Sequence, residues 1–201
     1  LERIRDRNLV GFLRSLKERD WGAGKVLKEH DERRAAAFHA EIAAGLDQAA
    51  KAAPLVMWQG QVLPGWIDYN GHMTESRYYF CNSETVDNFL RMIGAGMDYV
   101  AAGHSYYSAE THIRHLGEAK LGDQIRGELQ IISADEKRFR SFVRIMKGDD
   151  CVATVEQLCL HVDMQAGKTV AAAPEVWGKL QAVAKAQAGL PLPEGAGRAV
   201  G

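Results

Sequence analysis

The chain has 201 residues, a formal net charge of −1 and 46% apolar residues, which is enough to bury one core and a small appendage. The near-neutral charge argues against a nucleic-acid or anionic-membrane partner, because both require a sustained basic surface. No apolar run approaches the roughly 20 residues that cross a bilayer, and the chain starts at Leu1 without a signal-peptide apolar region, so we expect a fragment or processed piece of a cytoplasmic protein.

Two segments precede the predicted globular domain. Residues 1–34 interleave charged and apolar side chains at helical spacing, which predicts a helical tail. Residues 35–54 are rich in alanine and end at Pro54, so we interpret them as a helical linker.

A compact domain is predicted over residues 55–170. Its expected elements are a strand at 56–63, a long helix at 75–93 and four strands at 105–115, 124–134, 139–147 and 151–164, separated by turn-like segments. This order predicts an α+β domain in which one central helix packs against an antiparallel, five-stranded sheet. Residues 171–201 are expected to form a last helix from Pro174 to about residue 188 and a flexible tail.

The most informative segment is residues 66–73, which read Trp-Ile-Asp-Tyr-Asn-Gly-His-Met and directly precede the long helix. This spacing places Asp68, Asn70 and His72 in a turn beside a helix N-terminus, where unpaired N–H groups and about half a positive charge are available. A carboxylate held there suits attack on a carbonyl whose oxygen becomes negative. The alternative is that Asp68 only stabilises the turn, since Asp-x-Asn-Gly is common turn chemistry.

The order of elements and the Asp-x-Asn-Gly-His-Met motif resemble hotdog-fold acyl-CoA thioesterases of the 4-hydroxybenzoyl-CoA type over residues 55–165. The resemblance is closer to thioesterase modules that are fused behind L-carnitine dehydrogenase and assigned to betainyl-CoA hydrolysis, and residues 108–114 share in it. Residues 5–10 and 20–24 resemble the C-terminal end of a 3-hydroxyacyl-CoA-type dehydrogenase, although the chain has no Gly-x-Gly-x-x-Gly motif.

The resemblance implies a hotdog fold and the hydrolysis of a small acyl-CoA, betainyl-CoA in particular, to glycine betaine and CoA. It implies no cofactor beyond the CoA of the substrate, a homodimer or higher homo-oligomer, and an L-carnitine dehydrogenase domain in the same polypeptide. Two alternatives stay open: a hotdog enoyl or 3-hydroxyacyl thioester hydratase-dehydratase, and a non-catalytic acyl-CoA-binding module.

The expected catalytic residues are those of the motif and the helix start. Asp68 would attack the thioester directly or act as general base on a water, and the sequence leaves both routes open. The N–H groups of His72, Met73 and Thr74 are the oxyanion candidates, and Thr74 would be the N-cap. His72 would orient Asp68 or the carbonyl, or else only satisfy the loop, and Asn70 would be a turn residue that also touches the substrate.

The expected substrate-binding residues come from three places. A trimethylammonium group is best held by aromatic faces, and Trp66, Tyr69 and Tyr106 are the preferred cage. Arg138 and Arg140 form the densest basic cluster and are candidates for the CoA phosphates, although a solvated turn explains them equally well.

Glu110 is the last candidate, and strand alternation decides its direction. A regular strand would place Glu110 on the outer face with Ser108, His112 and Arg114, and would turn Tyr107, Ala109, Thr111 and Ile113 towards the helix. From the outer face Glu110 would point to solvent or reach a neighbouring subunit's site; the alternative is that it projects into the site of its own chain. No metal is expected, because His112 and His115 would point to opposite faces.

Overall fold

The structure, a computed structural model, describes residues 53–197, so the predicted helical tail and most of the alanine-rich linker lie outside the described residues. The elements are β1 (Leu55–Gln61), the 3-10 helix η1 (Pro64–Trp66), α3 (Glu75–Met92), α4 (Met97–Ala101), β2 (His104–His115), β3 (Gln124–Asp135), β4 (Arg138–Lys147), β5 (Asp150–Asp163), β6 (Lys168–Thr169) and α5 (Pro174–Gln187). The helices and strands predicted from residue 56 onward are confirmed to within about two residues at their ends. The sequence interpretation missed η1, α4 and β6, which are short and have little periodicity to detect.

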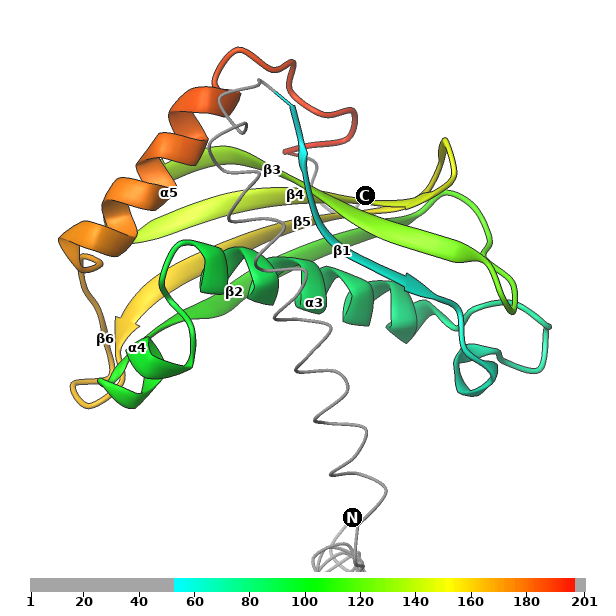
Figure 1. The fold of residues 1–201 in the computed structure, drawn as a ribbon, viewed down its shortest axis with the longest axis horizontal. Coiled ribbons are helices and arrows are strands. Elements are labelled where there is room, and N and C mark those ends of the chain that lie inside the picture. The colour runs from blue at the N-terminus through cyan, green and yellow to red at the C-terminus, as the bar shows by residue number, and fades with distance from the viewer. Residues whose placement is uncertain (1–52, 198–201) are drawn as a thin grey trace, which may run out of the picture. The chain divides into compact units, whose positions relative to one another are not determined.

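The strands form one antiparallel sheet in the order β1-β3-β4-β5-β2, and the two-residue strand β6 pairs with β5. The sheet among the described residues therefore has five principal strands, as predicted, and one short addition. Figure 1 shows that the sheet curves over α3, which runs along its concave face. The α+β arrangement of a central helix wrapped by an antiparallel sheet is confirmed, with β1 and β2 at the two edges.

The helix α3 sits close to the sheet because side chains interlock at its buried face. Phe89 is fully buried and meets Phe139 of β4 edge to face, with ring centroids 5.7 Å apart. Burying an aromatic side chain of this size stabilises the fold by about 2–3 kcal/mol. Nearer the helix start, Gly127 of β3 lies directly under Thr85, and a Cβ on Gly127 would collide with the Thr85 hydroxyl oxygen. A glycine is therefore required here for the helix to approach the strand.

The convex face of the sheet is covered at one end by α5 and the segment that follows it (Figure 1). The Gln187 side chain acts like a strand partner: its Oε1 accepts from the Ile131 N–H at 2.7 Å, and its Nε2 donates to the Leu129 carbonyl at 3.3 Å. Further on, the Gly197 N–H donates to Glu156 at 2.6 Å. The expectation of a flexible tail therefore does not describe residues 190–197, which are hydrogen-bonded to the sheet.

The edge strand β2 contains a β-bulge between Ser108 and Glu110, which shifts its pairing register with β5. Because the bulge adds one residue, Ser108 and Thr111 both point to the helix side, where their hydroxyls bond Gln157. The predicted alternation was therefore wrong for Ser108 and Tyr107, which exchange faces. Glu110 is on the outer, exposed side, as the alternation indicated.

Candidate active site

The motif forms a closed turn at the start of α3. Ile67 and Met73 pair as an isolated antiparallel bridge, and the Asp68 N–H donates to the His72 carbonyl at 3.0 Å. Gly71 has a φ of +79°, a left-handed backbone that a residue with a Cβ rarely adopts. The bridge between Ile67 and Met73 and the left-handed backbone of Gly71 hold the turn in one shape.

The Asp68 carboxylate is half-buried and is held by Asn70. Its Oδ1 accepts from the Asn70 N–H at 2.8 Å, and its Oδ2 accepts from the Asn70 side-chain amide at 3.3 Å. These bonds are the turn chemistry that the sequence suggested, and they also fix the direction of the carboxylate. Each oxygen keeps a lone pair for substrate or water. Asn70, rather than His72, orients Asp68.

His72 instead pairs with Glu118, a residue that the sequence interpretation missed. The His72 Nε2 lies 3.0 Å from the Glu118 Oε2, and the two side chains are 30% and 65% exposed. The loop that carries Glu118 is anchored on the motif, because the Ala119 carbonyl accepts from the Met73 N–H at 2.8 Å and the Ala119 N–H donates to the Tyr78 hydroxyl at 3.0 Å. No signal links His72 to Glu118 in the sequence.

The helix start corrects the predicted oxyanion donors. The Met73 N–H is taken by Ala119, and the Thr74 N–H donates to the Trp66 carbonyl at 2.9 Å, so neither is available to a substrate. The reason is that the residues before α3 already pair with neighbouring backbone. Among the described residues, no acceptor meets the N–H groups of His72, Glu75 or Ser76.

Thr74 occupies the N-cap position of α3, as predicted, but its hydroxyl donates to the Glu75 carboxylate at 3.0 Å instead of capping the helix. The side chain therefore leaves the first N–H groups of α3 unpaired by any described residue. These groups carry the positive end of the helix dipole, which favours an oxygen with developing negative charge.

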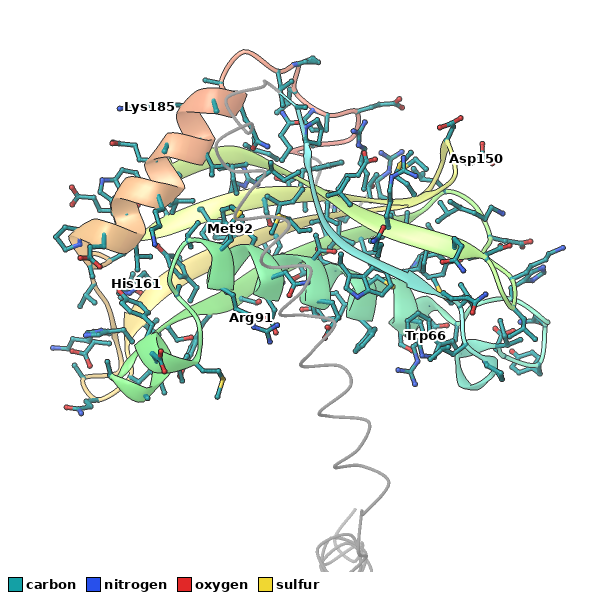
Figure 2. The ribbon with its side chains drawn as sticks, viewed as in Figure 1. Trp66, Arg91, Met92, Asp150, His161 and Lys185 are labelled. Atoms are coloured by element: carbon teal, nitrogen blue, oxygen red, sulfur yellow. The ribbon has the colours of Figure 1, made fainter. Side chains whose placement is uncertain are left out.

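The predicted aromatic cage does not form within the chain. Tyr69 is 97% exposed, and Tyr106 is buried against Phe139 and His161. Figure 2 shows Trp66 and His161 at opposite ends of α3, so Tyr106 is far from the motif turn.

Trp66 has other partners at the helix start. It lies beside the rings of Trp58 and Phe80, with centroids 6.4 and 5.4 Å away. The Arg77 guanidinium stands 5.7 Å from the Trp66 ring, so this aromatic cluster already contacts a cation of the chain itself.

The predicted phosphate-binding arginines are both engaged. Arg138 pairs with Asp135 at 2.8 Å, and Arg140 pairs with the buried Glu156 at 2.8 Å. The hairpin that carries Arg138 adjoins His161, because the His161 N–H donates to the Lys137 carbonyl. Arg138 and Arg140 therefore do not form a free basic cluster beside the motif.

Two buried cysteines, Cys81 and Cys159, are unsuited to act as nucleophiles. Burial raises the pKa of the Cys81 thiol to about 12 and that of Cys159 to about 12, so both are protonated thiols at neutral pH. In the part of the chain from residue 53 to 197, no three His, Cys, Asp or Glu side chains are placed to hold a metal ion together. His112 lies on the outer face, opposite Glu156, whereas His115 meets the Tyr78 ring on the helix side.

Comparison with known proteins adds a family to this geometry. The family model of the Thioesterase-like superfamily matches residues 62–180. Two relatives, from Ruegeria pomeroyi and Rhizobium meliloti, are each named L-carnitine dehydrogenase/betainyl-CoA thioesterase and are 46% and 49% identical over the whole chain. The chain spans only 40% and 41% of their lengths.

One shorter relative is matched over nearly its whole length. The Pseudomonas aeruginosa betainyl-CoA thioesterase is 32% identical over 73% of this chain and 94% of its own length. Among solved structures, a Staphylococcus aureus protein in complex with CoA aligns with a TM-score of 0.69 at 22% identity, over 74% of this chain and 96% of its own. A Pseudomonas putida KT2440 protein described as a thioesterase aligns with a TM-score of 0.65 at 28% identity, over the same shares.

Proposed function

The chain belongs to the Thioesterase-like superfamily, and we propose that it hydrolyses the thioester of betainyl-CoA to glycine betaine and CoA. The observation that carries the substrate is the Pseudomonas aeruginosa relative, which is named for the thioesterase activity alone and is matched over 94% of its length. The longer relatives are named for two activities, and the chain spans about two fifths of them. The thioesterase is therefore the activity that fits this part.

The reaction needs an oxygen nucleophile and stabilisation of the oxyanion. Asp68 supplies the carboxylate, whose direction Asn70 fixes. It attacks the carbonyl carbon to form a mixed anhydride that water then opens, or it removes a proton from the attacking water. In both routes the carbonyl electron pair moves to oxygen, the C–S bond breaks when that pair returns, and the CoA thiolate takes up a proton.

The unpaired N–H groups of Glu75 and Ser76 are the backbone donors that face this developing charge. They replace the Met73 and Thr74 donors that the sequence suggested. The His72 imidazole, paired with Glu118 at 3.0 Å, adds a hydrogen-bonding group at the same turn. The chemistry uses no cofactor, since CoA is part of the substrate and water is the second reactant.

The chain is proposed to act as a homodimer joined at β2. This strand is twelve residues long and lies at the edge of the sheet, where one row of its backbone groups has no strand partner among the described residues. Such an edge favours pairing with a second copy. A longer polypeptide with an L-carnitine dehydrogenase domain is proposed from the names of the longer relatives, and the cytoplasmic location expected from the sequence is kept as a proposal. No helix in the described part is long and apolar enough to span a bilayer.

The test is a thiol-release assay with three acyl-CoAs. Betainyl-CoA is compared with acetyl-CoA and with 3,3-dimethylbutanoyl-CoA, in which a carbon replaces the cationic nitrogen without changing the shape. We expect the highest kcat/KM for betainyl-CoA, and a loss of at least 10²-fold in Asp68→Asn with an unchanged Tm. No thiol release from any of the three would refute the proposed hydrolase, and full activity in Asp68→Asn would refute the catalytic role of Asp68. Equal rates for the cationic and neutral isosteres would refute the substrate.

A further inference from the structure

A cluster of hydroxyl groups lies between α3 and the edge strand β2, outside the motif. The side chain of Gln157, which is 2% exposed, stands at its centre. The Gln157 Nε2 lies 2.9 Å from the Ser108 hydroxyl, 3.3 Å from the Thr111 hydroxyl and 3.4 Å from the Tyr79 hydroxyl. Three oxygens from two elements therefore converge on one buried amide nitrogen.

The direction of the Gln157 amide determines what this cluster offers to a ligand. Its Oε1 accepts from the Asn82 side-chain amide at 3.4 Å, so its NH₂ group faces the hydroxyls. An oxygen that accepts a hydrogen bond from the amide turns its own proton elsewhere. For Ser108, the sulfur of the buried Cys159 is at hand as a weak acceptor. For Tyr79 and Thr111, no acceptor for the hydroxyl proton is found between residues 53 and 197.

The two free donors lie near the helix start. Tyr79 follows Glu75 by four residues, which is about 6 Å along the axis, and helical side chains lean towards the N-terminus. Tyr79 is 39% exposed and Thr111 is also exposed, so both residues lie partly at the surface, where a ligand can reach them. Tyr79 belongs to α3 and Thr111 to β2, and both hydroxyls contact the Gln157 Nε2. The two hydroxyls therefore lie close together although they come from different elements.

We propose that the hydroxyls of Tyr79 and Thr111 form a donor pair that binds the carbonyl oxygen of the thioester, beside the N–H groups of Glu75 and Ser76. This assignment rests on the proposed hydrolase function. As the nucleophile adds to the carbonyl carbon, the π electron pair moves to the oxygen, and the two O–H groups donate to it. When the C–S bond breaks, the pair returns to form the carbonyl of the anhydride or acid, and the donors keep their protons. Gln157 is the positioning residue: one proton of its NH₂ group goes to Ser108, and the other, shared between the Tyr79 and Thr111 oxygens, turns both hydroxyl protons away from the amide.

The test removes each hydroxyl without changing the shape of the side chain. Tyr79→Phe and Thr111→Val are compared with the wild type, with Tyr107→Phe on the opposite face of β2 and with Thr169→Val on β6 as matched controls. We expect kcat for betainyl-CoA to fall about 10²-fold in each cluster variant, with KM changed less than threefold, because the bond strengthens as the oxyanion forms. The controls should match the wild type in kcat, Tm and light-scattering mass.

A second readout does not depend on turnover. In the slow Asp68→Asn background, the stretching frequency of a ¹³C-labelled thioester carbonyl, measured by isotope-edited infrared spectroscopy, should rise when Tyr79→Phe or Thr111→Val removes a hydrogen bond. Cluster variants with wild-type kcat, or with only a raised KM, or with an unshifted carbonyl band, overturn the donor pair and leave the hydrolase standing. A wild type that releases no CoA overturns the hydrolase itself.

Discussion

The close approach of α3 to β3 at Gly127 provides a sharp test of how α3 is positioned on the sheet. In Gly127→Ala the new Cβ would overlap the Thr85 hydroxyl oxygen and lie 3.1 Å from two Thr85 carbons. Thr85 cannot turn away easily, because its hydroxyl donates to the Cys81 carbonyl at 2.7 Å and the residue is fully buried. Overpacking of this kind costs about 1–3 kcal/mol. For a domain of this size, a loss of about 2 kcal/mol lowers Tm by about 4–8 °C.

The strain should be relieved by removing the side-chain atoms that cause it. Thr85→Ala alone is expected to cost about 1 kcal/mol, through one lost hydrogen bond and a small cavity. The double variant should be at least about 1 kcal/mol more stable than the sum of the single variants predicts. Gly178→Ala, at an open position of α5, is the matched control and should be neutral or slightly stabilising.

Calorimetry measures the stability of the wild type, the two single variants, the double variant and the Gly178→Ala control. The thiol-release assay reports whether α3 has moved. Because the N–H groups of Glu75 and Ser76 move with α3, Gly127→Ala should also lose activity, and Thr85→Ala should restore part of it. Strictly additive free energies, or a Gly127→Ala protein as stable as Gly178→Ala, would refute the reasoning on close approach.

Three further expectations follow from the described contacts. Glu118→Gln should leave Tm within about 1 °C, because the pair is partly exposed, and should lower kcat, because the carboxylate that holds the His72 ring is lost; an unchanged kcat would show that Glu118 does not act through His72. Burial lowers the pKa of His161 below its ordinary value of 6.5, so the unfolded chain binds the proton first. The free energy of unfolding should therefore decrease below about pH 6.5, by at most about 1.4 kcal/mol per pH unit, until folded His161 is itself protonated. In His161→Gln, the free energy of unfolding, measured by denaturant titration at several pH values, should fall less steeply with decreasing pH. Ellman's reagent should leave Cys81 and Cys159 unmodified in the native protein, since burial raises both pKa values to about 12; rapid labelling of either would contradict their burial.

Local signals in the sequence were sufficient for the main architecture. The spacing of apolar residues along α3, the alternation in the strands and the turn residues between them predicted the central helix and the antiparallel sheet. The turn at Asp68 could also be anticipated, because the bonds from Asn70 to its carboxylate span only two residues. These features depend on residues that are close in the sequence, so the spacing of apolar and turn residues predicts them directly.

Contacts between distant residues were decided by the tertiary structure. The loop at residues 117–119 brings Glu118 to His72 and the Ala119 carbonyl to the Met73 N–H, which removed one predicted oxyanion donor. The bulge in β2 turned Ser108 towards Gln157, and a strand pattern with a strict period of two could not show it. Strand register and the path of the loops determine which side chains meet across a sheet, and a short stretch of sequence does not contain this information. The residues that contact the motif are therefore known only from the tertiary structure.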